Sequence, residues 1–465
     1  MRMRVAFLVP VALAGCTVGP NYRPPAASSL PVPEAYYGPA GEAGQPADLS
    51  RWWEQFNDPL LTRLVDEASA GNLDLAQAGT RLVQARESLV QARAGLLPTA
   101  DASAGAGRNF GPGNDQSSFS VGADVAWEAD LFGRIRRGIE ASRADAQGVY
   151  FDREALRVAI AAEVATNYMQ ARQAQERLAL ARDTLAIADD NLQIAGWRVE
   201  AGLVSSLDSE QARAARAQAA AAIPNLESNF ASATYRLAVL TGRAPGTLTG
   251  ELSAAKPIPD GPDQVAAGIP ADALRQRPDV RAAERNLAAQ TARIGVAEAQ
   301  LYPALRLSGN IGTSAFSLGG LFNAITGGIF SSLSQTLFDG GRLRAQVRSQ
   351  QAATEGALAA YRQSILTALE DVENALVALR AARERQTQFA VALEASNNSA
   401  ILARIQYRSG LTDFQQLLEA ERSLLSARDG LVTSRAAESL ALVQLYRALG
   451  GGWNAETAPE IGRSS

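Results

Sequence analysis

The spacing of hydrophobic residues changes along the chain, and its first change marks a helix followed by a hairpin. Residues 72–97 repeat apolar positions with a helical period, and Pro98 ends that helix. From 99 to 130 the chain is poor in leucine, rich in Gly, Ser and Ala, and interrupted at 111–115. The strand after the interruption places larger apolar side chains on one face: Val121, Ala123, Val125 and Trp127. Polar residues alternate with them, so this stretch predicts a β-hairpin.

A second hairpin is predicted in the second half of the chain. Leu305, Leu307 and Ile311 alternate with polar residues, and a Gly-rich stretch leads into 329–338. A sheet with one apolar and one polar face needs either a covering layer or closure with other copies around water. Four strands cannot close a barrel, whereas three copies of four strands can. A four-stranded soluble sheet covered by helices is the alternative.

Each hairpin is followed by an unusually long helical pattern. The two patterns cover 134–201 and 342–409, and neither contains a proline. At 1.5 Å per residue, each spans on the order of 100 Å. Apolar residues recur every seven positions in the first pattern: Leu178, Leu185, Leu192 and Val199. This heptad spacing predicts coiled-coil packing, and Gly202 and Gly410 mark where the chain turns back into helices at 206–240 and 412–449.

The N-terminus has the pattern of a bacterial lipoprotein signal. Two arginines precede an apolar run at 5–14, which is too short to cross a bilayer as a helix. The run ends at Leu13-Ala14-Gly15-Cys16, and Thr17 follows. We therefore expect Cys16 to be the acylated first residue of the mature chain, and a lone buried thiol is the alternative. Because Cys16 is the only cysteine, an internal disulfide and a multi-thiolate metal site are excluded.

Landmarks recur in the same order in the two halves, at an offset of about 205 to 208 residues. ARAGLLP at 92–98 is echoed by AEAQLYP at 297–303, and LFGRIR at 131–136 by LFDGGRLR at 337–344. The sequence therefore predicts two repeats of the same structural plan. The predicted order is a signal peptide at 1–15, a lipidated extended segment at 16–60, a first repeat at 61–268, a second repeat at 269–450 and a tail at 451–465.

The composition of the chain argues against catalysis and against nucleic-acid binding. The formal net charge is −4 and the basic residues are dispersed, so no nucleic-acid partner is implied. Histidine is absent, which excludes histidine triads and imidazole metal sites. The sequence contains no Gly-rich phosphate loop and no clustered carboxylate signature. We expect no enzyme activity, no cofactor and no metal.

Nearly the whole chain resembles the TolC-like outer membrane factors, in their NodT-type efflux lipoprotein branch. The resemblance is carried by Cys16-Thr17-Val18-Gly19-Pro20-Asn21-Tyr22, Trp52-Trp53-Glu54-Gln55-Phe56-Asn57-Asp58-Pro59-Leu60, Ile269-Pro270 with Leu274-Arg275-Gln276-Arg277-Pro278-Asp279-Val280, and Leu333-Ser334-Gln335-Thr336-Leu337-Phe338-Asp339-Gly340-Gly341. It implies an α+β membrane protein with two structural repeats, in which a trimeric β-barrel of four strands per chain is continuous with an α-helical coiled-coil barrel. It also implies three partners: a periplasmic adaptor, an inner-membrane transporter of the resistance-nodulation-division type, and outer-membrane lipid through Cys16.

The same resemblance implies where the functional residues lie. The two turns between long helices would dock the adaptor: Gly202, Leu203, Val204 and Ser205 in the first, Gly410, Leu411 and Thr412 in the second. Asp413, Gln416 and Glu419 follow at i, i+3 and i+6, so threefold symmetry would arrange them as rings at a periplasmic aperture. Tyr407 and Arg408 are candidates for groups that tie helices shut. The alternatives are that the two turns are ordinary connections between helices, and that Asp413, Gln416 and Glu419 lie on a helix face exposed to solvent.

The resulting hypothesis is a gated exit duct that passively conducts small molecules through the outer membrane and extends into the periplasm. An outer-membrane channel for type I protein secretion and a non-conducting periplasmic structural lipoprotein are the alternatives. Drugs, aromatic acids, metals and siderophores all stay open as cargo, as do the cognate pump and the resting state.

Overall fold

The computed structural model describes residues 17–26, 30–33, 35–37, 49–112, 116–262, 265 and 270–454. The predicted signal peptide and the expected acylation site, Cys16, lie outside the described residues, as does the tail beyond Asn454.

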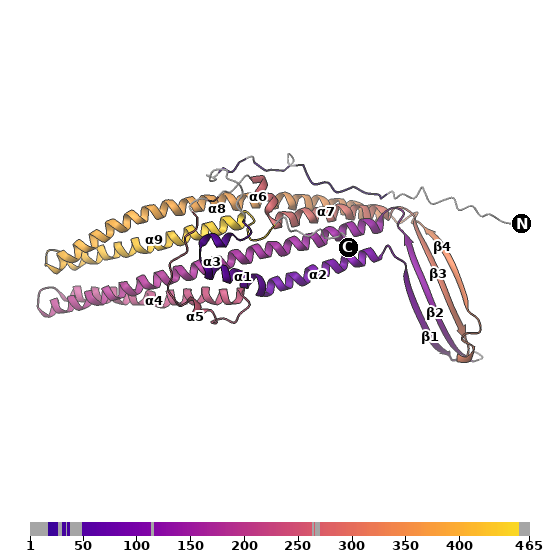
Figure 1. Ribbon diagram of the computed structural model, residues 1–465, viewed down its shortest axis with the longest axis horizontal. Coiled ribbons are helices and arrows are strands. Elements are labelled where there is room, and N and C mark those ends of the chain that lie inside the picture. Colours follow the sequence, from indigo (N-terminus) through magenta and orange to yellow (C-terminus); the bar gives the residue numbers. More distant parts are fainter. Residues whose placement is uncertain are drawn as a thin grey trace.

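The molecule is elongated, with a sheet at one end and two helical hairpins reaching the other end (Figure 1). The strands are β1 (Thr99–Asn109), β2 (Gln116–Ala129), β3 (Ala304–Ala315) and β4 (Thr326–Ser334). They form an antiparallel sheet in the order β1-β2-β3-β4. The two hairpins are thus confirmed, although β4 ends at Ser334, four residues before the predicted end at 338.

The register places apolar and polar side chains on opposite faces of the sheet. Val121 lies opposite Thr313 and Trp127 opposite Leu307, so the apolar face of β2 continues onto β3. The other face carries Asp124 and its partners on the neighbouring strands, Asp101 and Asn310. Among the described residues, β1 and β4 each pair on one side only, so the backbone groups of both sheet edges are left unpaired.

The helices repeat in length between the two halves. They are α1 (Pro59–Gly71), α2 (Leu73–Ala94), α3 (Arg134–Glu200), α4 (Ser206–Leu240), α5 (Thr249–Leu252), α6 (Pro270–Gln276), α7 (Pro278–Ala299), α8 (Arg342–Arg408) and α9 (Phe414–Ala448), with short 3-10 turns η2 (Trp52–Phe56) and η3 (Leu318–Gly320). The helices α3 and α8 each have 67 residues, α4 and α9 each have 35, and α2 and α7 each have 22. In the part of the chain that the structure describes, no helix is both long and apolar enough to span a bilayer.

The long helices change partners along their length. Near the sheet, α3 packs against α2 and α7, and α7 packs against α8; toward the far end, α3 packs against α4 and α9, and α9 packs against α8. The side-by-side order is therefore α2-α3-α7-α8 near the sheet and α4-α3-α9-α8 at the far end. Only α3 and α8 run through both levels, so they carry the structure from the sheet to the tips (Figure 1).

The largest hydrophobic core lies where these two levels meet. Trp52, Trp53 and Phe56 of η2 are buried there, together with Tyr446 near the end of α9. The rings of Trp52 and Tyr446 are stacked with centroids 5.2 Å apart. The tryptophan-rich segment before α1 is therefore a wedge between the two halves, and its aromatic rings bury more area than any aliphatic residue could.

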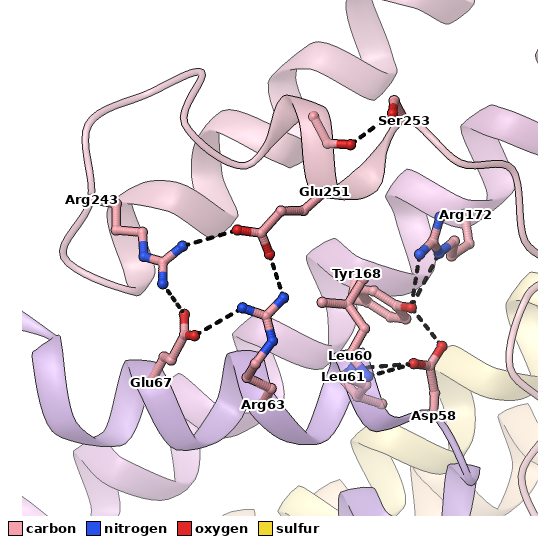
Figure 2. Close-up of polar contacts among 11 residues, drawn as sticks. Asp58, Leu60, Leu61, Arg63, Glu67, Tyr168, Arg172, Arg243, Glu251 and Ser253 are labelled. Carbon is pink, nitrogen blue, oxygen red and sulfur yellow. Dashed lines mark hydrogen bonds and ion pairs between the residues drawn. The ribbon is translucent and has the colours of Figure 1, made fainter.

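A fully buried arginine organises the polar contacts beside this core (Figure 2). The Tyr168 hydroxyl donates to Asp58 at 2.5 Å and accepts from Arg172 at 3.2 and 3.1 Å. Arg172 also donates to Gln175 and to the Ala254 carbonyl, at 2.6 and 3.0 Å. Asp58 caps α1, because its other oxygen accepts from the first backbone N–H groups of that helix. The network thus fixes the start of α1 against α3 and the segment after α5.

Four charged side chains, Arg63, Glu67, Arg243 and Glu251, form a closed ring of ion pairs on the surface of the same region. Glu67 pairs with Arg63 at 3.1 Å and with Arg243 at 2.9 Å, and Glu251 pairs with the same two arginines (Figure 2). All four are partly exposed, so each pair alone contributes little stability. Their closed arrangement nevertheless fixes α1 to the connection between α4 and α5.

The N-terminal segment is fastened where the sheet meets the helices. The guanidinium of Arg137, on α3, donates to the carbonyls of Val18 and Gly19 at 3.1 and 3.0 Å and to the Asn21 side chain at 2.7 Å. Gly19 has φ +88°, and a Cβ there would lie 2.4 Å from the Cα of Gly295 on α7. Only glycine therefore fits at this position.

Gly430 predicts a stability test of the α8–α9 contact. A Cβ at Gly430 would lie 2.3 Å from the ring of Phe389, whereas a Cβ at Gly138 on α3 would meet nothing within 4 Å. We expect Gly430→Ala to cost about 1–3 kcal/mol through overpacking, and Gly138→Ala to be neutral or mildly stabilising. Thermal unfolding followed by circular dichroism in detergent measures both, and equal melting temperatures for the two variants would contradict the packing.

Candidate functional site at the helical tips

The two turns at the far end have the same backbone geometry. Gly202 and Gly410 have φ of +68° and +72°. The N–H of Leu203 donates to the Arg198 carbonyl, and the N–H of Leu411 donates to the Gln406 carbonyl, each at 2.8 Å. Each turn is therefore a glycine-ended helix C-cap that satisfies the last carbonyls of its long helix. The side chains of Leu203 and Leu411 are 69% and 79% exposed.

The residues after each glycine begin the returning helix. Ser205 accepts from the N–H of Leu207 at 3.3 Å, and Asp413 accepts from the N–H of Gln416 at 2.9 Å. The helix α9 thus begins at Phe414, two residues after the predicted start at Thr412, because Asp413 is its N-cap. The Thr412 hydroxyl donates to the side-chain oxygen of Gln416 at 2.6 Å.

The three residues expected at an aperture differ in whether their side chains take part in these contacts. Asp413 and Gln416 are both exposed and are both engaged in the local cap. Glu419 lies farther along α9, is also exposed, and makes no hydrogen bond or ion pair with any described residue. Glu419 is therefore the carboxylate of this set that is free to face a pore or a partner.

Tyr407 is a buried contact between α8 and α3. Its ring is 1% exposed and lies against Phe414, with ring centroids 5.7 Å apart. The guanidinium of Arg198, on α3, lies 4.5 Å from the centroid of the same ring and donates to the Tyr407 carbonyl at 3.1 Å. The neighbouring candidate, Arg408, is exposed and forms no hydrogen bond or ion pair within the described chain. Arg198 supplies the cation at this contact.

A second polar contact joins three helices about two turns deeper. Glu421 on α9 accepts from Asn191 on α3 at 2.6 Å and pairs with Arg404 on α8 at 3.2 Å. Burial raises the pKa of Glu421 above its ordinary value, and the Arg404 guanidinium opposes that rise. Farther from the tips, Arg177 on α3 holds Asp429 on α9 through two bonds of 2.6 and 3.2 Å. The motifs in the sequence did not indicate any of these contacts.

A cavity of about 450 Å³ lies along the same seam, between α3, α4 and α9. Small side chains such as Ala181, Ala188 and Ala212 line it, and Arg177, Asp429 and Glu421 lie at its wall. The seam between the hairpin α3–α4 and the hairpin α8–α9 is therefore incompletely packed. The hairpins are joined here by these polar contacts and by a small buried cluster that includes Ala195, Ala212, Tyr407 and Phe414.

A sheet with one apolar and one polar face, extended by two long helical hairpins, defines a channel subunit of the outer membrane. A sequence model described as outer membrane efflux protein matches residues 64–243 and 269–451. Nodulation protein T of Rhizobium leguminosarum bv. viciae is 32% identical over 98% of this chain and 94% of its own length. The outer membrane protein OprJ of Pseudomonas aeruginosa is 32% identical over 97% and 95%.

Solved structures agree with these sequences. The outer-membrane channel OprN superposes with a TM-score of 0.85 at 38% identity, covering 94% of this chain and all of that one. The chain belongs to the outer membrane efflux protein family. It is located in the outer membrane and serves as the channel component of an efflux system. The members of this family are channel and efflux proteins.

The three-helix contact predicts how substitutions at Glu421 change conductance. In Glu421→Ala, Arg404 and Asn191 lose their acceptor, so the seam should weaken and the conductance in planar bilayers should rise. Glu421→Gln keeps one acceptor oxygen for Arg404, and the Asn191 amide can turn over to accept from the new NH2 group, so this variant should conduct closer to the parent. A rise of the same size in both variants would contradict this role for the acceptor.

The same residue predicts a pH dependence. Because burial raises the folded-state pKa of Glu421, the folded state binds its proton more tightly than the unfolded state does. The stability contributed by this carboxyl therefore falls as pH rises from its ordinary pKa through the raised pKa. Glu421→Gln should gain melting temperature relative to the parent as pH rises through that window, and parallel pH profiles would contradict the prediction.

Proposed function

We propose that three copies of this chain close a barrel of four strands per copy and form a passive, gated duct, without enzyme activity. The duct works with a periplasmic adaptor and an inner-membrane transporter of the resistance-nodulation-division type. The observation that carries the proposal is the sheet, whose edges β1 and β4 are both open and whose faces differ in polarity. A membrane-embedded sheet must pair every backbone group, and closure with other copies is the way to do so.

The duplication supports a particular pairing of the open edges. In the first hairpin Thr99 lies opposite Ala126, and in the second Ala304 lies opposite Ser334. The offset between repeats is thus 205 residues for the first strand of each hairpin, β1 and β3 (Thr99 to Ala304), and 208 for the second strand, β2 and β4 (Ala126 to Ser334). Applying these offsets to the observed pairing of β2 with β3 gives the pairing of β4 with β1 of the next copy.

In the observed pairing Ala123 lies opposite Ile311. Its equivalent places Ser331 opposite Ala106 of the next copy, and both residues are on the apolar face. The same register places Leu337, which is 91% exposed, opposite Ala100. Closure would therefore extend β4 beyond Ser334 and cover an edge that a single chain leaves open.

The gate lies at the helical tips, where the channel would narrow by threefold repetition. Support comes from the seam, because the contacts of Arg198 with Tyr407 and of Glu421 with Arg404 must change if one hairpin swings away from the other. Glu419 supplies a ring of three carboxylates, and such rings favour cations. The exposed tips from Gly202 to Ser205 and from Gly410 to Thr412 dock the adaptor, with Leu203 and Leu411 as its apolar contacts.

The lipid anchor is Cys16, which precedes the fastened segment. Arg137 holds Val18 and Gly19 at the joint between sheet and helices, and the N–H of Val18 donates to the Phe132 carbonyl at 3.2 Å. These contacts support the assignment, because they hold the residues that follow Cys16 at the joint between sheet and helices, and acyl chains on Cys16 would then enter the inner leaflet of the outer membrane.

Single-channel recording tests the duct and the ring together. We expect the purified parent to show a small, cation-selective conductance in planar bilayers. Glu419→Gln should lose much of that selectivity, because three carboxylates leave the aperture. Glu210→Gln is the matched control, since Glu210 lies at a similar place on α4 and pairs with Arg213. Unchanged selectivity in Glu419→Gln removes this residue from the aperture, and a parent without any conductance contradicts the duct.

A further inference from the structure

The second hairpin is almost free of charge, because Arg306 near the start of β3 is its single charged residue. Residues 307–338 contain no Asp, Glu, Lys or Arg, whereas the first hairpin includes Asp101, Arg108 and Asp124. The turn between β3 and β4, residues 316–325, lies within this uncharged segment. It exposes four large apolar side chains: Phe316 at 68%, Leu318 at 70%, Phe322 at 73% and Ile325 at 64%. Clustered exposure of this kind marks an interaction surface.

The β3–β4 turn folds over the apolar face of the sheet. Thr313 is on that face, opposite Val121, and its hydroxyl donates to the Leu321 carbonyl in the turn. A Cβ at Gly320 would lie 3.5 Å from the Cβ of Ala315, which is two residues along β3 from Thr313 and so shares its face. Both contacts therefore place the turn over the apolar face of the sheet.

We propose that the β3–β4 turn is an apolar collar that inserts among the acyl chains of the outer leaflet at the exit of the barrel. The collar rests on the proposed function, because that function puts the sheet in the membrane with its apolar face toward lipid. The turn is continuous with that face through Ile311 on β3 and Ile329 on β4, which is 92% exposed. The absence of charge makes hydrocarbon a suitable surrounding for the apolar side chains of the turn.

The collar has a consequence for conduction. A turn that lies outside the barrel leaves the polar face of the second hairpin uncovered at the exit. Three copies would then hold the rim of the barrel in lipid at three points, and this turn would not narrow the path of the cargo. Closure of the duct is thereby left to the periplasmic tips.

Nitroxide labels test where the turn lies. Each of three variants carries one added cysteine: Leu318→Cys in the turn, Ile329→Cys on the lipid face of β4, or Leu411→Cys at the periplasmic tip. The variants are labelled and placed in palmitoyl-oleoyl-phosphatidylcholine vesicles. The parent protein carried through the same labelling reports any reaction at Cys16. Power saturation then compares collisions of each label with oxygen, which enters lipid, and with a water-soluble nickel chelate.

We expect the label at Leu318 to resemble that at Ile329, with oxygen collisions several-fold more prominent relative to the chelate than at Leu411. A chelate-accessible label at Leu318 beside a lipid-exposed label at Ile329 overturns the collar alone. Chelate access at both positions overturns the membrane-embedded sheet, and with it the proposed function.

Single-channel conductance distinguishes a turn that lies in lipid from a turn that blocks the exit of the barrel. The double variant Leu318→Ser with Phe322→Ser should conduct like the parent, because a collar in lipid lies outside the path of ions. A conductance increase would mean that the three turns meet over the lumen and restrict the exit, which contradicts the collar.

Discussion

Backbone hydrogen bonding inside hydrocarbon is the constraint from which the rest of this structure follows. A strand edge that faces lipid leaves N–H and C=O groups unpaired, and each such group costs several kcal/mol. The sheet of one chain has two such edges, at β1 and β4. A single chain therefore leaves both edges unpaired in a membrane, and in the proposed duct the long helices would close around the same axis as the strands. The open edges explain both the need for partners and the shape of the protomer.

In the proposed duct the duplication meets this constraint, because the pairing of β2 with β3 inside the chain would be repeated by β4 and β1 between copies. The two halves match in helix length, with 67 residues in each long helix, so both hairpins reach the same depth. The two halves nevertheless differ in their contacts with the N-terminal segment and in the charge of their hairpins. The N-terminal segment is held by Arg137 of α3 at Val18 and Gly19 and then contacts the second half, where Tyr22 donates to Glu284 of α7 at 3.0 Å. Residues 307–338 of the second half carry no charge, whereas the first hairpin includes Asp101, Arg108 and Asp124.

Periodicity in the sequence predicted the long helices, both hairpins and the repeat, because these depend on local spacing. Their ends were predicted less well. The start of α9 depends on the choice of Asp413 over Thr412 as cap, and the end of β4 depends on a partner strand that a single chain lacks. The contacts of Arg198, Arg404 and Glu421 could not be predicted, because they join helices far apart in the sequence. Asn191 immediately precedes Leu192 of the heptad, at a flanking position where polar residues are usual, so the spacing alone did not single it out.

The most direct test of this account is a disulfide across the proposed seam between copies. Ser331→Cys combined with Ala106→Cys should, on oxidation in the membrane, link chains into a covalent trimer, whereas Ser331→Cys with Ala104→Cys should not, because its partner is two residues out of register. A covalent trimer from the first pair alone is the expected result. Failure of the first pair to link, or linkage only in the shifted pair, would contradict closure of the barrel through β4 and β1.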